Sequence, residues 1–332
     1  MDDTDNEVIN SISDSDQNAH SLHISEVRPL SKSFKEVFQD FENSCISCFS
    51  ILQNSQNINK NKANHERRIS IWNTFESISK NFLESIDKLN IPEWEILKNR
   101  DKGHILRHTL GSLIALMLNP EYYNLSEYDK NLLLWAILFH DIGKRVSPEV
   151  YNRDPFHPFL SAKILLKVFV EFGWIKNIEY ANKIAEIIGK SFVIKDMDEV
   201  IDHSYIKIIL PLLWYCTRMV NVLHEEIQEY VNIEKITEIE DRFEYEILVL
   251  VLLHQSLEFN PQYPNRENIT IDDIKNYLSP RIVYLSMILH KADHNSYNLG
   301  MIPYNLFPND LYITRVCNEI IEILNANFYK ND

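Results

Sequence analysis

The segment NLLLWAILFHDIGK, residues 131–144, constrains the fold more than any other part of the sequence. Apolar residues fill almost every position, so a helix formed here must be covered by other elements on all sides. The helix should stop at Gly143, which leaves the polar pair His140-Asp141 at the end of a buried helix. An imidazole and a carboxylate in such a place need hydrogen bonds, a counter-charge or a metal ion, because burying them without partners is costly.

The remainder of the chain indicates an all-α fold. Apolar residues recur at helical spacing, and Pro280 suits the first turn of one helix. The predicted helices span 34–52, 68–89, 103–119, 157–172, 177–193, 204–230, 236–257, 280–297 and 309–328. No sustained alternation of apolar and polar residues predicts a strand. Only 6 of the 332 residues are glycine, which disfavours Gly-rich phosphate loops and turn-dense β folds.

The charge of the chain limits its partners. The formal net charge is −15, and long nucleic acid is an unfavourable ligand for such a protein, because phosphate neutralisation needs patches of lysine and arginine. Residues 1–33 are rich in acids and poor in apolar residues, which predicts a disordered acidic tail. No apolar run reaches the ~18 residues of a membrane span, and the start MDDTDNE lacks the features of a signal peptide. We therefore expect a cytoplasmic protein.

Several histidines and aspartates lie in or beside apolar helical segments. They are His104, His140, Asp141, His157, His254 and Asp293. Imidazole nitrogens and carboxylate oxygens suit Mn, Fe, Zn, Co or Ni, with Mg as an alternative. Adjacent helical residues point ~100° apart, but Gly143 gives the backbone freedom to turn both members of the His-Asp pair toward one site. Lys144 can then face the same cavity and bind a phosphate oxygen.

The order of these residues resembles the HD-domain superfamily of metal-dependent phosphohydrolases. The resemblance rests on His104-x-x-Arg107, on HDIGK at 140–144 and on Asp293 in LHKAD. The stretch HDIGKRVSPEVYNRDPFHPFLSAKIL is similar to the HD domains of tRNA nucleotidyltransferases and cyclic-dinucleotide phosphodiesterases, in which a histidine opens the next helix, as His157 does here. The GYP signature of one phosphodiesterase variant is absent, which argues against a cyclic dinucleotide as the substrate.

The resemblance implies an all-α HD bundle and a division of the chain. It covers about residues 100–297. The interval between the His-Asp pair and the last aspartate is long for a compact HD domain, so we expect an insertion around 194–245. Residues 34–99 would then be a helical extension, and 298–332 a C-terminal helix that packs on the bundle.

The resemblance also implies a first metal site. Its ligands would be His104, His140, Asp141 and Asp293. His108 lies one turn after His104 on the same helix face. We expect His108 to support a ligand or to face solvent, and direct contact with the metal is an alternative.

A second metal ion would share Asp141 and would be held by His157 and one further histidine. The family's dinuclear members place that histidine soon after the helix that His157 begins, where this chain has none. His254 can take the place if residues 194–245 are an insertion, and His203 is a weaker candidate. His157 as an exposed residue at a helix start and His254 as a hydrogen-bonded core histidine remain alternatives.

The resemblance implies a function as a phosphohydrolase that cleaves a phosphate ester of a nucleotide or related small molecule by a metal-activated water. Arg107 and Lys144 would hold phosphate oxygens, although Lys144 can also be a solvated surface residue. One alternative is an HD-type oxygenase with two irons, which needs both His157 and His254 as ligands. Another is a non-catalytic HD domain that serves as a regulatory or interaction module.

Overall fold

The computed structural model describes part of the chain, and every regular element of that part is a helix. The described residues are 31–45, 78–99, 103–144, 157–176, 178–179, 181–182, 242–254, 279–296, 314–315, 317–318 and 321–322. The main helices are α2 (Phe34–Val37), α5 (Pro92–Asn99), α6 (His104–Leu118), α7 (Pro120–Tyr123), α8 (Glu127–Phe139), α9 (His157–Glu171), α13 (Arg242–Leu253) and α15 (Pro280–Ser296). Residues 41–45 and 78–89 are also helical. The predicted all-α fold is therefore confirmed.

Helix α8 begins earlier than the apolar segment that predicted it. Ser126 caps the helix, since its hydroxyl oxygen accepts a hydrogen bond from the backbone N–H of Asp129 at 3.1 Å. Helices α6, α9, α13 and α15 fall within their predicted segments, and α15 starts at Pro280 as expected. The predicted helix at 204–230, nearly all of the expected insertion and the acidic tail up to residue 30 lie outside the described residues. None of the described helices is both long and apolar enough to cross a membrane.

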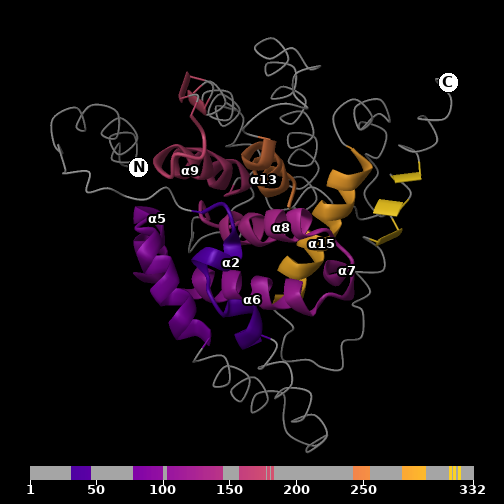
Figure 1. The fold of residues 1–332 in the computed structure, drawn as a ribbon, viewed down its shortest axis with the longest axis horizontal. Coiled ribbons are helices and arrows are strands. Elements are labelled where there is room, and N and C mark those ends of the chain that lie inside the picture. Colours follow the sequence, from indigo (N-terminus) through magenta and orange to yellow (C-terminus); the bar gives the residue numbers. More distant parts are fainter. Residues whose placement is uncertain are drawn as a thin grey trace, which may run out of the picture. The chain divides into compact units, whose positions relative to one another are not determined.

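Helix α8 lies at the centre of the described bundle. Every residue from Leu132 to Phe139 is at most 1% exposed. The helix packs against α2, α6, α9, α13 and α15, and Figure 1 shows it between α6 on one side and α9 and α13 on the other. The expectation of a helix covered on all sides is confirmed, and its C-terminal residues enter the interior of the protein.

An ion network joins the first turns of α8, α13 and α15. The Arg281 guanidinium of α15 donates hydrogen bonds to Asp129 of α8 and, at 2.8 Å, to Oε1 of Glu246 in α13. Arg242 donates to the same oxygen of Glu246 at 3.1 Å. Arg281 thus links α15 to α8 and α13, two of the helices against which it packs.

The segment before α2 is attached to the bundle by main-chain and side-chain contacts. The carbonyl oxygen of Lys32 accepts hydrogen bonds from Nε1 of Trp135 at 2.9 Å and from the Asn131 amide at 2.8 Å. The Lys32 ammonium pairs with Glu244 of α13 at 2.5 Å. The ring of Phe34 packs edge-on against Trp135, with centroids 5.3 Å apart. Lys32 belongs to the expected tail at 1–33 and Phe34 begins the expected helical extension, so residues on both sides of that boundary contact the central helices.

Candidate metal centre

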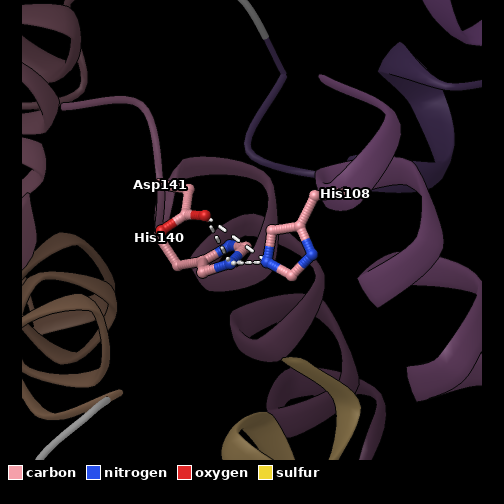
Figure 2. A group of neighbouring side chains, drawn as sticks. All are labelled: His108, His140 and Asp141. Atoms are coloured by element: carbon pink, nitrogen blue, oxygen red, sulfur yellow. Dashed lines mark hydrogen bonds and ion pairs between the residues drawn. The ribbon is translucent and has the colours of Figure 1, made fainter. Parts of the chain in front are cut away.

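One group of metal-ligand side chains lies where α6, α8 and α15 meet. Nε2 of His108 is 2.7 Å from Oδ1 of Asp293 and 3.4 Å from Oδ2 of Asp141. Nε2 of His140 is 3.4 Å from Nε2 of His108, 3.6 Å from Oδ2 of Asp141 and 3.5 Å from Oδ1 of Asp293. Figure 2 shows the rings of His108 and His140 and the Asp141 carboxylate converging on one point. We call these four residues site 1.

A second group lies on the other side of Asp141, between α9 and the end of α13. Nε2 of His157, the first residue of α9, is 2.9 Å from Oδ1 of Asp141 and 2.9 Å from Nε2 of His254. His254 directly follows α13, and its Nε2 is 3.9 Å from the same aspartate oxygen. Both histidines are fully buried. We call Asp141, His157 and His254 site 2.

The two sites share the Asp141 carboxylate. Its Oδ2 faces the imidazoles of site 1 and pairs with the Lys144 ammonium at 2.7 Å. Its Oδ1 faces the imidazoles of site 2 and accepts no hydrogen bond of normal geometry from the described residues, although it is buried. A buried carboxylate oxygen without such a donor needs another positive partner. This arrangement is that of a carboxylate able to bridge two cations.

Hydrogen bonds set the tautomers of two of the histidines. Nδ1 of His140 lies 2.6 Å from the carbonyl oxygen of Ile137, and Nδ1 of His254 lies 2.6 Å from that of Val251. A carbonyl oxygen can only accept, so each Nδ1 carries the hydrogen. The neutral rings then present the lone pair of Nε2 to the sites, which is the form in which imidazole binds a metal.

Burial and neighbouring charges shift the pKa values of the histidines in the centre. Burial lowers the pKa of His108. Burial, together with the nearby His157 and His140, lowers the pKa of His254 well below its usual value. Burial acts in the same direction at His140, but the Asp141 carboxylate and then Asp293 outweigh it and raise the His140 pKa. The two carboxylates of site 1 therefore favour positive charge beside the His140 ring.

Burial alone would raise the pKa of both aspartates of the centre. At Asp141 the charges of Lys144, His140 and His157 outweigh burial and hold the pKa well below its usual range. At Asp293 the contacts with the His108 and His140 imidazoles have the same effect. Both carboxylates therefore stay ionised at neutral pH. Ionised carboxylates and imidazole lone pairs that converge in a buried space fit a divalent transition metal ion.

Close packing of α9 against the turn after α8 brings the two sites together. The backbone N–H of Gly143 donates a hydrogen bond to the Ser161 hydroxyl oxygen at 3.0 Å. A Cβ on Gly143 would lie 2.4 Å from the backbone nitrogen of Ser161 and 2.6 Å from the carbonyl carbon of Leu160. Gly143 is not among the described glycines with positive φ. The expected reason for this glycine, backbone freedom, is therefore wrong, since the residue is needed for the close approach of α9.

The structure does not bring His104 into site 1, where the sequence placed it. His104 is the first residue of α6 and is exposed, whereas His108, one turn later, is buried and reaches Asp141 and Asp293. Arg107 is also exposed. Helical periodicity puts residues four apart on one face and cannot choose between them. The apolar run that follows His108 was the available signal, because it shows that burial increases from the start of α6 toward its middle.

The remaining predicted residues lie in the centre. Asp141, His140 and Asp293 meet as expected, and His254 lies beside His157, which is buried and not an exposed helix start. The ammonium of Lys144 contacts Asp141 instead of standing in solvent. His203 lies outside the described residues. Sequence reasoning missed two side chains that contact residues of the two sites, Ser296 at Nδ1 of His108 and His290 at the carbonyl oxygen of His254.

Comparison with known proteins identifies a family for the part of the chain that holds most of the centre. Residues 105–244 match the family model of the HD domain. The matched segment contains His108, His140, Asp141 and His157, and it ends before the last two ligand candidates. Searches of the curated proteins and of the solved structures found no significant match. Residues 105–244 therefore belong to an HD domain, as the order of the histidines and aspartates in the sequence predicts.

Proposed function

We propose that this chain is a metal-dependent phosphohydrolase that uses two metal ions, one in each site. The observation that carries the proposal is the position of Asp141. Its Oδ2 faces His108 and His140, and its Oδ1 faces His157 and His254. A single buried carboxylate flanked by two pairs of imidazoles is a ligand set for two cations. If only one site held a cation, the two imidazole lone pairs of the other site would face each other without a positive partner.

The donor atoms also favour a class of metal. Four imidazoles and two carboxylates suit Mn, Fe, Co, Ni or Zn better than Mg, which prefers oxygen ligands. A divalent ion held by these residues supplies Lewis acidity toward a phosphoryl oxygen and lowers the pKa of a coordinated water. The chain's own contribution is to hold the ligands in place, with the tautomers of His140 and His254 already set by backbone carbonyls.

The position of Lys144 supports the proposal that the substrate carries a phosphate. Its ammonium lies 2.7 Å from Oδ2 of Asp141, and its side chain is 17% exposed. From this position it can donate a hydrogen bond to a phosphoryl oxygen while it balances the charge of the aspartate. Arg107 and His104 are exposed at the start of α6, close in sequence to His108, and can contact the remainder of an anionic substrate.

The overall charge supports a small substrate. A net charge of −15 repels a long polyanion, whereas a single phosphate ester needs only the few cations beside the centre. We therefore propose a nucleotide or a related small phosphate ester as the substrate.

Metal analysis of the purified full-length chain, followed by a phosphate-release screen, tests the proposal. The screen should cover nucleotides and cyclic nucleotides with Mn, Ni, Co and Mg. We expect up to two ions per chain and metal-dependent release of phosphate. Asp141→Ala should lose both properties and keep its helical circular-dichroism spectrum, because one residue contributes to both sites.

A matched control is Glu95→Ala, which removes a carboxylate whose side chain is 64% exposed. This variant should keep the metal content and the activity of the unmodified chain. Phosphate release by Asp141→Ala at the full rate would refute the proposal.

The same centre is compatible with a second function. An HD-type oxygenase with two irons needs both His157 and His254 as ligands, and both lie beside Asp141. Iron content and oxygen consumption distinguish this function from the first. Two bound irons, oxygen uptake with an organic substrate and no phosphate release would favour the oxygenase.

A further inference from the structure

We propose that α15 positions one histidine of each metal site, His108 through Ser296 and His254 through His290. This inference rests on the proposed two-metal centre and concerns how the chain holds it. Asp293 is the α15 residue placed in site 1. Ser296 and His290 are the residues three positions after it and three positions before it.

Ser296 determines which nitrogen of His108 is free to bind a cation. The Ser296 oxygen lies 2.6 Å from the carbonyl oxygen of Asp293 and 2.8 Å from Nδ1 of His108. A carbonyl oxygen has no hydrogen, so the single hydroxyl hydrogen of Ser296 must be donated to it. The hydroxyl can then only accept from Nδ1–H of His108. The neutral His108 ring therefore carries its lone pair on Nε2, the atom that faces Asp141 and Asp293.

His290 acts on site 2 through the main chain. It is 1% exposed, and its Nδ1 lies 2.9 Å from the carbonyl oxygen of His254. By the same reasoning Nδ1 of His290 carries a hydrogen and donates it. Carbonyl groups in the last turn of a helix lack a partner within the helix, and His254 directly follows α13. The bond from His290 thus fixes the end of α13, while the contact of His254 with Val251 orients the ring.

The spacing of the three α15 residues explains how one helix serves both sites. Each step of three residues turns the side chain by about 60° and advances it by about 4.5 Å along the axis. His290, Asp293 and Ser296 therefore cover an arc of about 120°, with the aspartate in the middle. A shift of α15 would therefore move Asp293 of site 1 together with Ser296 and His290, which support one histidine in each site.

Titration of the metal-free full-length chain with Mn²⁺, followed by the electron paramagnetic resonance of the free ion, tests this role without measuring activity. Mutation of a residue that hydrogen-bonds a metal-binding histidine typically lowers the metal affinity by about 10- to 100-fold. Ser296→Ala should lower the affinity for one of the two ions by this factor. Ser296→Thr, which keeps the hydroxyl, should bind that ion as the unmodified chain does. His290→Leu should weaken the other ion, and His290→Asn, whose amide can replace Nδ1–H as the donor, should restore it.

A second substitution assigns each effect to a site. In a His157→Ala background site 2 loses a ligand, and one ion should remain. Ser296→Ala should still weaken that ion, whereas His290→Leu should leave it unchanged. Ser286→Ala is the control, because Ser286 is a buried serine of α15 whose hydroxyl makes no hydrogen bond with the described residues. It should bind both ions as the unmodified chain does.

Nitrogen-15 NMR of the imidazoles in the metal-free chain provides a readout that is independent of metal. His108 should carry its hydrogen on Nδ1, and Ser296→Ala should change that signal while Ser296→Thr keeps it. Unchanged Mn²⁺ affinity in Ser296→Ala and His290→Leu, or equal losses in the alanine and threonine variants, would overturn the inference. A chain that binds two ions and releases no phosphate would contradict the proposed function alone. A chain that binds none of Mn²⁺, Fe²⁺, Co²⁺, Ni²⁺ and Zn²⁺ would contradict that function, and the NMR signals would then decide the role of Ser296.

Discussion

Gly143→Ala should damage site 2 while leaving site 1 intact. The added Cβ would lie 2.4 Å from the backbone nitrogen of Ser161 and 2.9 Å from Cβ of Leu160. These atoms belong to α9 and cannot rotate away, and carbon contacts are comfortable only at about 3.5 Å or more. Helix α9 must therefore move outward by about 1 Å. His157 lies one turn before Ser161 on this helix, so its ring should withdraw from Asp141 by a similar distance.

Two effects of Gly143→Ala should lower the free energy of unfolding. Overpacking in a close-packed interior destabilises by about 1–3 kcal/mol. The hydrogen bond from the Gly143 N–H to the Ser161 hydroxyl, 3.0 Å long, would lengthen or break, and such a bond contributes about 1 kcal/mol. We expect Gly143→Ala to lower the free energy of unfolding by about 2–4 kcal/mol.

Urea unfolding followed by circular dichroism, together with Mn²⁺ titration, measures both consequences. Gly143→Ala should bind one ion instead of two, because the ligands of site 1 come from elements other than α9. Gly173→Ala is a matched control, since a Cβ there meets nothing within 4 Å but the backbone has φ +67°. It should cost about 1–2 kcal/mol through its left-handed backbone alone and keep both ions. A Gly143→Ala chain with unchanged stability and two tightly bound ions would refute the packing argument.

Three further substitutions test other contacts. Lys144→Gln should lower kcat/KM for phosphate release by about 100-fold with no loss of bound metal, because it removes a positive charge beside Asp141; unchanged kinetics would remove Lys144 from the proposed site. Arg281→Met should lower the free energy of unfolding by about 1–3 kcal/mol in urea titrations, since it removes the cation that joins Asp129 to Glu246; full stability would show that the network is not needed. Lys32→Met should destabilise by about 1–2 kcal/mol because Glu244 is buried, and adding Glu244→Gln should recover part of that loss in a double-mutant cycle; additive losses would contradict a direct interaction.

Most of the helical fold could be predicted from the sequence because its signals are local. The apolar run at 131–139 leaves no polar side for solvent, and a helix of that kind must be central. Pro280 marks the start of α15 correctly because its fixed φ suits the first turn. The choice between His104 and His108 depends instead on how deeply α6 enters the bundle, which is a property of its packing on α15. The roles of Ser296 and His290 depend on the same packing and have no local signature.

Site 2 could be predicted in part, because it has a local signal but its geometry depends on packing. His157 and His254 are 97 residues apart in sequence, and their rings meet because α9 packs on α13. The sequence has no histidine soon after α9, and in the proposed site 2 the end of α13 provides one. A local signal for it exists, because His140 and His254 each follow directly on a long apolar helical run.

This pattern has a physical reason. The last carbonyl groups of a helix have no partner within it, and in both cases Nδ1–H of the histidine donates to the carbonyl oxygen three residues before it. That bond satisfies a buried acceptor, fixes the tautomer and directs Nε2 beyond the end of the helix. An apolar helix that ends in histidine therefore presents one imidazole lone pair at a defined place. Two such helices, α8 and α13, packed side by side, bring their terminal histidines to opposite oxygens of Asp141, which is the arrangement that the proposed second site requires.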